Sequence, residues 1–88
     1  MDELMDQWRA EVLSRDGYTC QFPDCGANTH LEAHHLISRR NRELRYDPDN
    51  GVTVCHHHHQ LLTHSPIEND RFHALVLADR LDGIQRNL

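Results

Sequence analysis

The stretch Cys55-His56-His57-His58-His59 places four consecutive histidines directly behind a cysteine. It lies inside the chain, between the apolar Val52-Thr53-Val54 and Gln60-Leu61-Leu62, whereas affinity tags lie at chain ends. Histidine binds metals and exchanges protons near neutral pH, and His34-His35 forms a second adjacent pair. These histidines point to metal binding, which in so short a chain would help to organise the fold.

The three cysteines indicate which metal site the chain builds. A chain of 88 residues buries only about 60% of the surface that it exposes when unfolded. Aromatic residues make up just 6% of this chain, so a structural metal or disulfides must supplement its core. An odd number of cysteines argues against a disulfide framework. Cys20 and Cys25 form one ligand pair and Cys55 with His58 a second, which together complete a tetrahedral zinc site. Buried free thiols are the alternative.

Apolar periodicity and turn residues predict the secondary structure. Leu4, Trp8 and Val12 recur at four-residue spacing, which indicates a helix over residues 2–15 that packs through these three side chains and ends at Gly17. A turn-rich zinc knuckle follows over residues 18–29. Residues 29–37 alternate as a strand would, and the turn at residues 47–51 leads into a second short strand over residues 52–54.

Two helices are expected in the last third of the chain. The first spans about residues 55–64 and contains the histidine run. Ser65, Pro66 and Glu68 form a capping box with proline at the first helical position, so a further helix should begin there. We expect this helix over about residues 66–82, ending at Gly83, with Phe72, Leu75, Val76 and Leu81 facing inward.

Charge is distributed unevenly along the chain. The net charge of −5 argues against nucleic-acid binding when it is taken over the whole sequence. Residues 34–46, however, contain four arginines and a single acid, and guanidinium groups match phosphate oxygens. These arginines are Arg39, Arg40, Arg42 and Arg45. A phosphate-binding loop and a solvated surface loop are equally compatible with this cluster.

The histidine pairs stand in a recognisable order. Residues 31–37 read Leu-Glu-Ala-His-His-Leu-Ile, residues 49–55 read Asp-Asn-Gly-Val-Thr-Val-Cys, and His58-His59 follow. This string resembles the HNH endonuclease family, and residues 15–25 are similar to its zinc-bearing subset and, more weakly, to small phage-type members. The resemblance covers roughly residues 9–64. It implies an α+β fold in which residues 1–88 form one domain, with a ββα-metal core at about 30–64 and a helix on either side.

The resemblance also implies an activity and a role for each site residue. The family hydrolyses DNA phosphodiester bonds with a divalent cation such as Mg²⁺, Mn²⁺, Ni²⁺ or Zn²⁺. His35 would be the general base, Asn50 would fix the loop or orient His35, and His34 with His59 would hold the catalytic cation. Many members carry a further ligand at the position of Thr63, so we include His64, one residue later, as a candidate that a distorted turn would bring in.

Other functions remain open at this point. The chain can instead be a catalytically inactive zinc module that binds nucleic acid or a protein partner, because Thr63 replaces a ligand and the net charge is negative. A histidine-rich metal buffer is a remoter alternative. No apolar run approaches the roughly 20 residues that span a bilayer, and the chain starts with acidic residues, so we expect a cytoplasmic location. The resemblance implies DNA as the partner. A homodimer, or a phage packaging or recombination partner, is a further option.

Overall fold

The computed structural model describes the backbone of residues 2–86 and the side chains of residues 2–79. Its elements follow one another as α1 (Glu3–Arg15), β1 (Leu31–His35), a 3₁₀ turn η1 (Pro48–Asn50), β2 (Gly51–Cys55), α2 (His56–His64) and α3 (Pro66–Arg86). This is the predicted order of a small α+β fold with a helix at either end. None of the described helices has both the length and the apolar character needed to cross a membrane.

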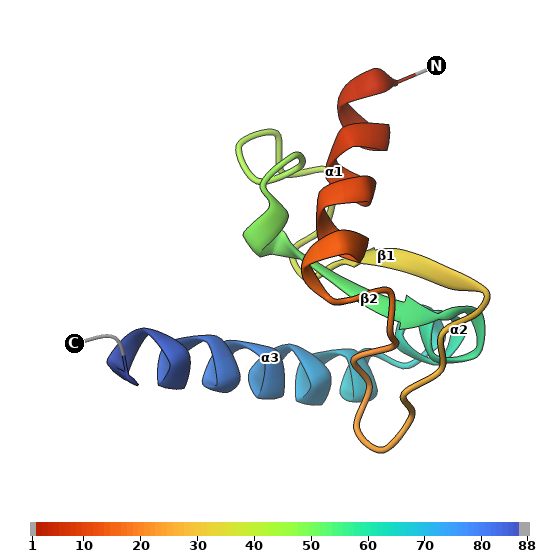
Figure 1. Cartoon of the computed structure of the whole chain (residues 1–88), viewed down its shortest axis with the longest axis vertical. Helices are drawn as coiled ribbons and strands as arrows, with labels where there is room; N and C mark the ends of the chain where they lie inside the picture. The colour runs from red at the N-terminus through yellow and green to blue at the C-terminus, as the bar shows by residue number, and fades with distance from the viewer. Residues whose placement is uncertain (1, 87–88) are drawn as a thin grey trace.

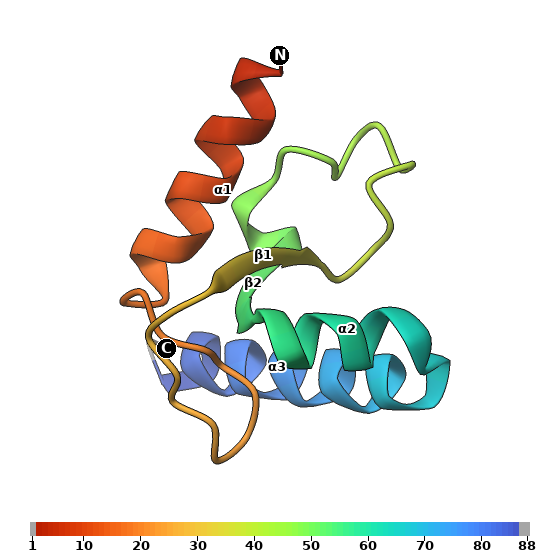
Figure 2. The ribbon, with the colours of Figure 1, turned by 90° about the vertical axis from the view of Figure 1, so that its right-hand side faces the viewer.

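The two strands form an antiparallel sheet that lies between helices. In its register Leu31 pairs with Cys55 and His35 pairs with Gly51. Helix α1 stands upright against one side of this pair, while α2 and α3 run side by side beneath it (Figures 1 and 2). Every residue of β2 is buried, as expected for a strand that is covered on both faces.

The main core lies between β2 and the two C-terminal helices. Its buried members are Cys20, Leu36, Val52, Val54, Cys55, Leu62 and Phe72. Two predicted inward positions are wrong, because the side chains of Leu4 and Leu75 are each 55% exposed. Leu4 lies one turn before Trp8, where α1 extends past the sheet (Figure 1), so helical spacing alone overstated the length of the packed stripe.

Helix α1 is attached to the sheet by polar contacts at its C-terminal end. The guanidinium group of Arg15 donates to the backbone oxygens of Pro48 and Gly51, both at 2.7 Å. The Asp16 carboxylate accepts from Arg15 at 3.0 Å and from the backbone N–H of Thr53 at 2.8 Å. These bonds fix the helix across the sheet. Gly17, at φ 64°, then turns the chain in the left-handed conformation that ends helices.

The C-terminal helix begins as predicted but ends later. The backbone N–H of Glu68 lies 3.4 Å from the Ser65 hydroxyl, as in a capping box. The helix then continues through Gly83 to Arg86, so the predicted end at Gly83 is wrong. A glycine inside a helix costs only about 1 kcal/mol, which a long helix tolerates. The side chain of Leu81, predicted to face inward, lies outside the described residues.

Candidate metal centre and active site

Three cysteines and one histidine converge where the knuckle meets the start of α2. The potential ligand atoms of Cys20, Cys25, Cys55 and His58 all lie within 4.8 Å of one another. The Sγ atoms of Cys25 and Cys55 are 4.0 Å apart, and Nδ1 of His58 lies 3.3 Å from Sγ of Cys55. A tetrahedral zinc with its usual bond lengths requires separations of about 3.6–3.8 Å between ligand atoms. The group therefore has the composition and the size of a structural zinc site.

The pKa values of the cysteine thiols indicate how metal binding at this group will depend on pH. Burial raises the pKa of the Cys20 thiol to about 11. The backbone N–H of Ala27 lowers the pKa of the more exposed Cys25. A thiol kept protonated by burial must lose its proton when a metal binds, so the affinity of this group for zinc will rise with pH.

An aromatic ring that sequence reasoning missed holds the histidine of this group. The ring of Phe22 stacks on the ring of His58, with centroids 4.0 Å apart and planes 6° apart. Phe22 in turn stacks on Phe72 of α3, at 5.4 Å. The candidate zinc ligands are thus continuous with the apolar core, and residues far apart in the sequence fix the orientation of His58.

A second candidate site is an open pocket of about 690 Å³ along β1. It brings together residues of α1, β1, α2 and the loop that carries Arg39, Arg40, Arg42 and Arg45, called here the arginine loop. The lining residues are Met5, Trp8, Arg9, Glu32, Ala33, His34, His35, Ser38, Arg39, His59 and Thr63. Three of the four histidines to which the resemblance gives a catalytic or cation-binding role therefore share one pocket. The fourth, His64, is exposed at the end of α2 and does not line the pocket.

Two histidines of this pocket face each other edge to face. The ring centroids of His34 and His59 are 5.3 Å apart, with planes at 73°. Nε2 of His34 lies 2.9 Å from Oδ1 of Asn69, and Nδ1 of His59 lies 3.3 Å from Oε1 of Glu32. Because both oxygens accept hydrogen bonds, Nδ1 of His34 and Nε2 of His59 are the nitrogens left to bind a cation.

These two histidines do not form a complete metal cage by themselves. Among residues 2–79, the cysteine group is the one set of three or more histidine, cysteine or acidic side chains whose ligand atoms lie within 4.8 Å of one another. Helix α2 is regular here, and the Thr63 hydroxyl donates to the backbone oxygen of His59 at 2.8 Å. Position 64 is rotated by about 100° from position 63, so the structure does not bring His64 to His34 and His59.

Burial and hydrogen bonding determine the charge of these groups. Burial lowers the pKa of His34, and the hydrogen bond with Asn69 offsets only part of that effect. For Glu32, burial raises the pKa, but hydrogen bonds from His56 and His59 outweigh it, and the net pKa lies below its usual value. Near neutral pH the pocket therefore holds a neutral His34 beside an ionised Glu32.

His35 faces Trp8 of α1 whereas His34 faces α2 and α3, as alternation along a strand predicts, and both residues border the same open pocket. Its Nε2 lies 3.0 Å from the backbone carbonyl oxygen of Arg45. A carbonyl oxygen can only accept, so Nε2 carries the ring proton and Nδ1 carries the lone pair. Burial lowers the pKa of His35, so the ring is neutral near pH 7. His35 thus has the protonation state of a general base.

Asn50 braces the loop between the strands. Its side-chain oxygen accepts from the backbone N–H of Ile37 at 2.7 Å. Its amide group donates to the backbone oxygens of Ile37, at 2.9 Å, and Leu44, at 3.1 Å. Asn50 is buried and does not line the histidine pocket. The structure therefore gives Asn50 the loop-fixing role, one of the two that the resemblance implied.

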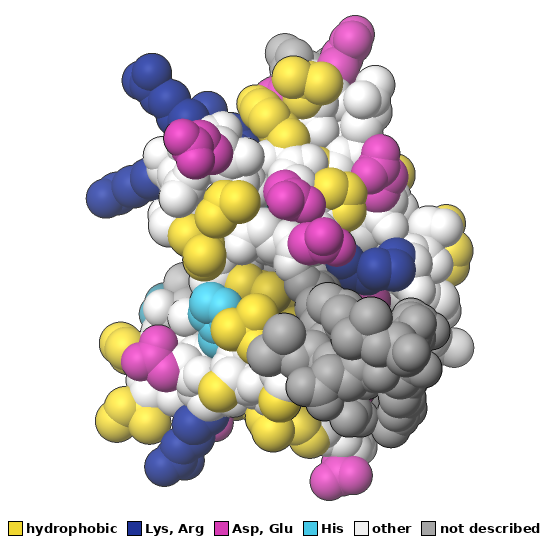
Figure 3. Space-filling model, turned by 90° about the vertical axis from the view of Figure 1, so that its left-hand side faces the viewer, with side chains coloured by type: hydrophobic (Ala, Val, Ile, Leu, Met, Phe, Trp, Pro, Cys, Tyr) yellow, Lys and Arg dark blue, Asp and Glu magenta, His cyan; other side chains and the backbone are white. Residues whose placement is uncertain are grey.

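The arginine loop borders the histidine pocket. Arg39 lines it and also lines an adjoining pocket of about 420 Å³, together with Arg40, Arg45, Asp2 and Met5. Nε of Arg45 donates to the backbone oxygen of Arg39 at 2.7 Å, so Arg45 helps to shape the loop, while Arg40 and Arg42 are exposed. On the face drawn in Figure 3, arginines project singly among acidic side chains, and the described part of that face shows no continuous basic patch.

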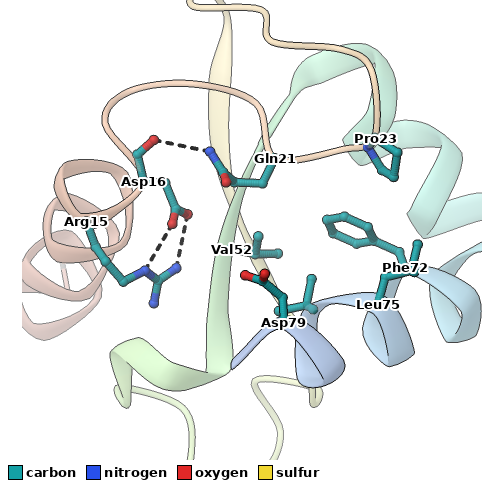
Figure 4. A pocket seen from close by; sticks show the side chains of 9 residues that line it. Arg15, Asp16, Gln21, Pro23, Val52, Phe72, Leu75 and Asp79 are labelled. Atoms are coloured by element: carbon teal, nitrogen blue, oxygen red, sulfur yellow. Dashed lines mark hydrogen bonds and ion pairs between the residues drawn. The ribbon is translucent and has the colours of Figure 1, made fainter. Parts of the chain in front are cut away.

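A further pocket, of about 310 Å³, lies between the end of α1, the knuckle and α3 (Figure 4). The ion pair of Arg15 with Asp16 stands at one side, and the apolar side chains of Val52, Phe72 and Leu75 stand at the other. The side-chain amide of Gln21 donates to the backbone oxygen of Asp16. Arg15 and Asp16 already attach α1 to the sheet, and the lining adds one further charged side chain, Asp79, but no histidine or cysteine, unlike the histidine pocket.

Sequence reasoning foresaw the zinc group and the histidines but not their supporting residues. Glu32 had a usable signal, because it lies two residues before His34 on the same face of a predicted strand. Asn69 and Phe22 had none, since their contacts cross between separate elements.

Comparison of the chain with protein-family models, with curated proteins and with solved structures finds no match.

Proposed function

We propose that this chain is a metal-dependent endonuclease of the HNH type that hydrolyses DNA phosphodiester bonds. The observation that carries the proposal is His35, whose Nε2–H is held by the Arg45 carbonyl and whose Nδ1 is left as the basic nitrogen. It lines one pocket together with His34, His59 and Arg39. That combination supplies a base, two cation ligands and a phosphate-binding group.

The residues of the pocket divide the work of hydrolysis. Nδ1 of His35 takes a proton from a water molecule, whose oxygen then bonds to phosphorus as the bond to the 3′ oxygen breaks. This leaves a 5′ phosphate and a 3′ hydroxyl, which gains its proton from solvent. Arg39 and Arg9 line the pocket and hold the phosphate by charge-assisted hydrogen bonds. A divalent cation held by His34 and His59 would stabilise the negative charge that develops in this step.

Second contacts around the two cation ligands support the same function. Histidines that bind metals usually donate their other ring N–H to a carboxylate or carbonyl oxygen. Glu32 can accept such a bond from Nδ1 of His59, and the side-chain oxygen of Asn69 can accept one from Nε2 of His34. Cys20, Cys25, Cys55 and His58 would hold a structural zinc, which would fix the start of α2, on which His59 lies.

Plasmid cleavage tests the proposal directly. We expect the purified protein to nick or cut plasmid with Mg²⁺, Mn²⁺ or Ni²⁺, and to be inactive with EDTA. His35→Ala should abolish cleavage, because no other group of the pocket replaces Nδ1. His64→Ala is the matched control, since His64 is exposed outside the pocket, and it should cut as the wild type does. Equal rates for His35→Ala and the wild type would refute the mechanism.

A catalytically inactive zinc module is the second candidate function. Thr63 favours it, because a hydroxyl that donates to the helix backbone stands where many members of the HNH family have a ligand. This alternative predicts one zinc per chain, no cleavage with any divalent metal, and nucleic-acid binding that weakens when Arg39, Arg40 and Arg42 are replaced. Cleavage that disappears in His59→Ala would exclude it.

A further inference from the structure

Helix α1 contributes Met5, Trp8 and Arg9 to the histidine pocket, and Trp8, which lies before the stretch that the HNH resemblance covers, touches His35 directly. Trp8 is the single tryptophan of the chain and is only 3% exposed. Its ring lies flat against the ring of His35, with centroids 3.8 Å apart and planes 8° apart. The side chain assigned as the general base is therefore covered on one face by a residue from a different element.

Trp8 itself is held in place from two directions. Its indole Nε1–H donates to the backbone oxygen of Asp47 at 2.8 Å. Its six-membered ring packs against Gly51 so closely that a Cβ atom there would lie 2.7 Å from Cζ2 of Trp8. The indole is thus a fixed surface rather than a side chain that follows the movements of His35.

The contacts of His35 restrict two different movements of its ring. Stacking on Trp8 prevents the imidazole plane from tilting. The hydrogen bond from Nε2 to the Arg45 carbonyl opposes a half-turn of the ring about its Cβ–Cγ bond, which would put Cε1 in the place of Nε2 and Cδ2 in the place of Nδ1. Neither contact alone fixes both the plane and the orientation of the ring.

We propose that Trp8 is a positioning residue for His35, which holds the imidazole in the plane where Nε2 meets the Arg45 carbonyl and Nδ1 remains free to accept a proton. The inference rests on the proposed function of His35 as the general base. It gives α1, which precedes the two strands and α2, a direct part in the active site. Misplacing a reacting group slightly is enough to slow an enzyme strongly.

Three variants separate positioning from packing. Trp8→Leu removes the stacked ring, and Trp8→Phe keeps a ring without the indole N–H. Val12→Ala is the matched control, because Val12 is fully buried on the same helix and also packs on Gly51, but has no ring contact with His35. Trp8→Met replaces Trp8→Leu if the latter does not fold, as judged by its zinc content and circular dichroism.

Two measurements are made on each zinc-loaded variant. Nitrogen-15 NMR of the histidine rings, without DNA, reports which nitrogen of His35 carries the proton. We expect the Nε2–H form in the wild type, Trp8→Phe and Val12→Ala, and a mixture of both forms in Trp8→Leu. For plasmid cleavage with Mn²⁺ we expect kcat of Trp8→Leu to fall about tenfold, equivalent to about 1.4 kcal/mol, with KM unchanged and with kcat largely restored in Trp8→Phe.

The outcomes distinguish this inference from the endonuclease proposal. If Trp8→Leu keeps the wild-type His35 spectrum and its kcat falls no further than that of Val12→Ala, Trp8 is a packing residue and the inference is overturned. If the wild type does not cleave DNA at all, the endonuclease proposal fails. A change in the His35 spectrum confined to Trp8→Leu would in that case still show that Trp8 positions the ring.

Discussion

Oε1 of Glu32 lies 3.3 Å from Nδ1 of His59, across the space between β1 and α2. The same carboxylate accepts from Nδ1 of His56 at 2.8 Å. An ionised carboxylate only accepts hydrogen bonds, so it fixes His59 with its proton on Nδ1 and its lone pair on Nε2. This contact sets which nitrogen of His59 can bind a cation.

Replacing Glu32 should therefore weaken the cation site that we propose at His34 and His59. An amide in Glu32→Gln can donate as well as accept, so His59 is no longer held in one tautomer, and we expect cleavage to slow by about 10–100-fold. The measurement is the cleavage rate as a function of Mn²⁺ concentration. His56→Ala is the control, because it removes the exposed partner of the same carboxylate and should change the rate little. An equal reduction of the rate in both variants would contradict this role.

The cysteine group should make folding depend on zinc. We expect one zinc per chain, and we expect chelation or Cys20→Ala to unfold the protein, because a structural zinc contributes about 10 kcal/mol in small domains. Metal analysis and circular dichroism measure both effects. His58→Cys is the matched variant, since zinc accepts four thiolates as readily as three thiolates and one imidazole. It should retain zinc, and a protein that stays folded without metal would refute the prediction.

Stability should fall as the solution is acidified below about pH 6.5, the ordinary pKa of histidine. The pKa values of His34, His35 and His58 are all lowered in the folded protein, in each case chiefly by burial. The unfolded chain therefore binds protons first as pH falls, and the stability present above pH 6.5 decreases progressively as pH falls through the folded-state values. Thermal unfolding across this range, with zinc content followed at each pH, measures the effect. A constant Tm with zinc retained would argue against it.

Asn50→Ala should destabilise the fold rather than only slow catalysis. The substitution leaves the Ile37 N–H and the backbone oxygens of Ile37 and Leu44 without their partner, at a cost of about 1–3 kcal/mol for a buried group. Asn41→Ala is the control, because Asn41 makes similar hydrogen bonds in the same loop but is exposed, so water can replace it. Chemical unfolding of both variants provides the comparison. If Asn50→Ala is as stable as Asn41→Ala, Asn50 does not brace the loop.

The arginine loop should contribute to DNA affinity by binding phosphates. Replacing Arg40 or Arg42, which are exposed, should weaken binding similarly for any DNA sequence and reduce the slope of log affinity against log salt by about one for each arginine replaced. Binding titrations at several salt concentrations measure this slope. Arg71→Ala on α3 is the control, because Arg71 pairs with Glu68 and does not line either pocket. An unchanged slope in the loop variants would show that the loop does not bind phosphates.

The sequence by itself determined the parts of this protein that depend on neighbouring residues. The short spacings within the pairs Cys20–Cys25 and Cys55–His58, the capping residues at Ser65, and the alternation of His34 and His35 follow from local geometry, and each agrees with the structure. Turns, helix caps and strand alternation involve residues that are close in the chain, so their patterns can be read directly.

The tertiary structure alone decided which side chains meet across elements. Trp8 against His35, Asn69 against His34 and Phe22 against His58 are contacts between residues far apart in the sequence. It also decided that Leu4 and Leu75 are exposed although their spacing matches a buried stripe. The physical reason is that the angles and lengths with which whole helices pack on the sheet set these contacts, and no local pattern of residues specifies them.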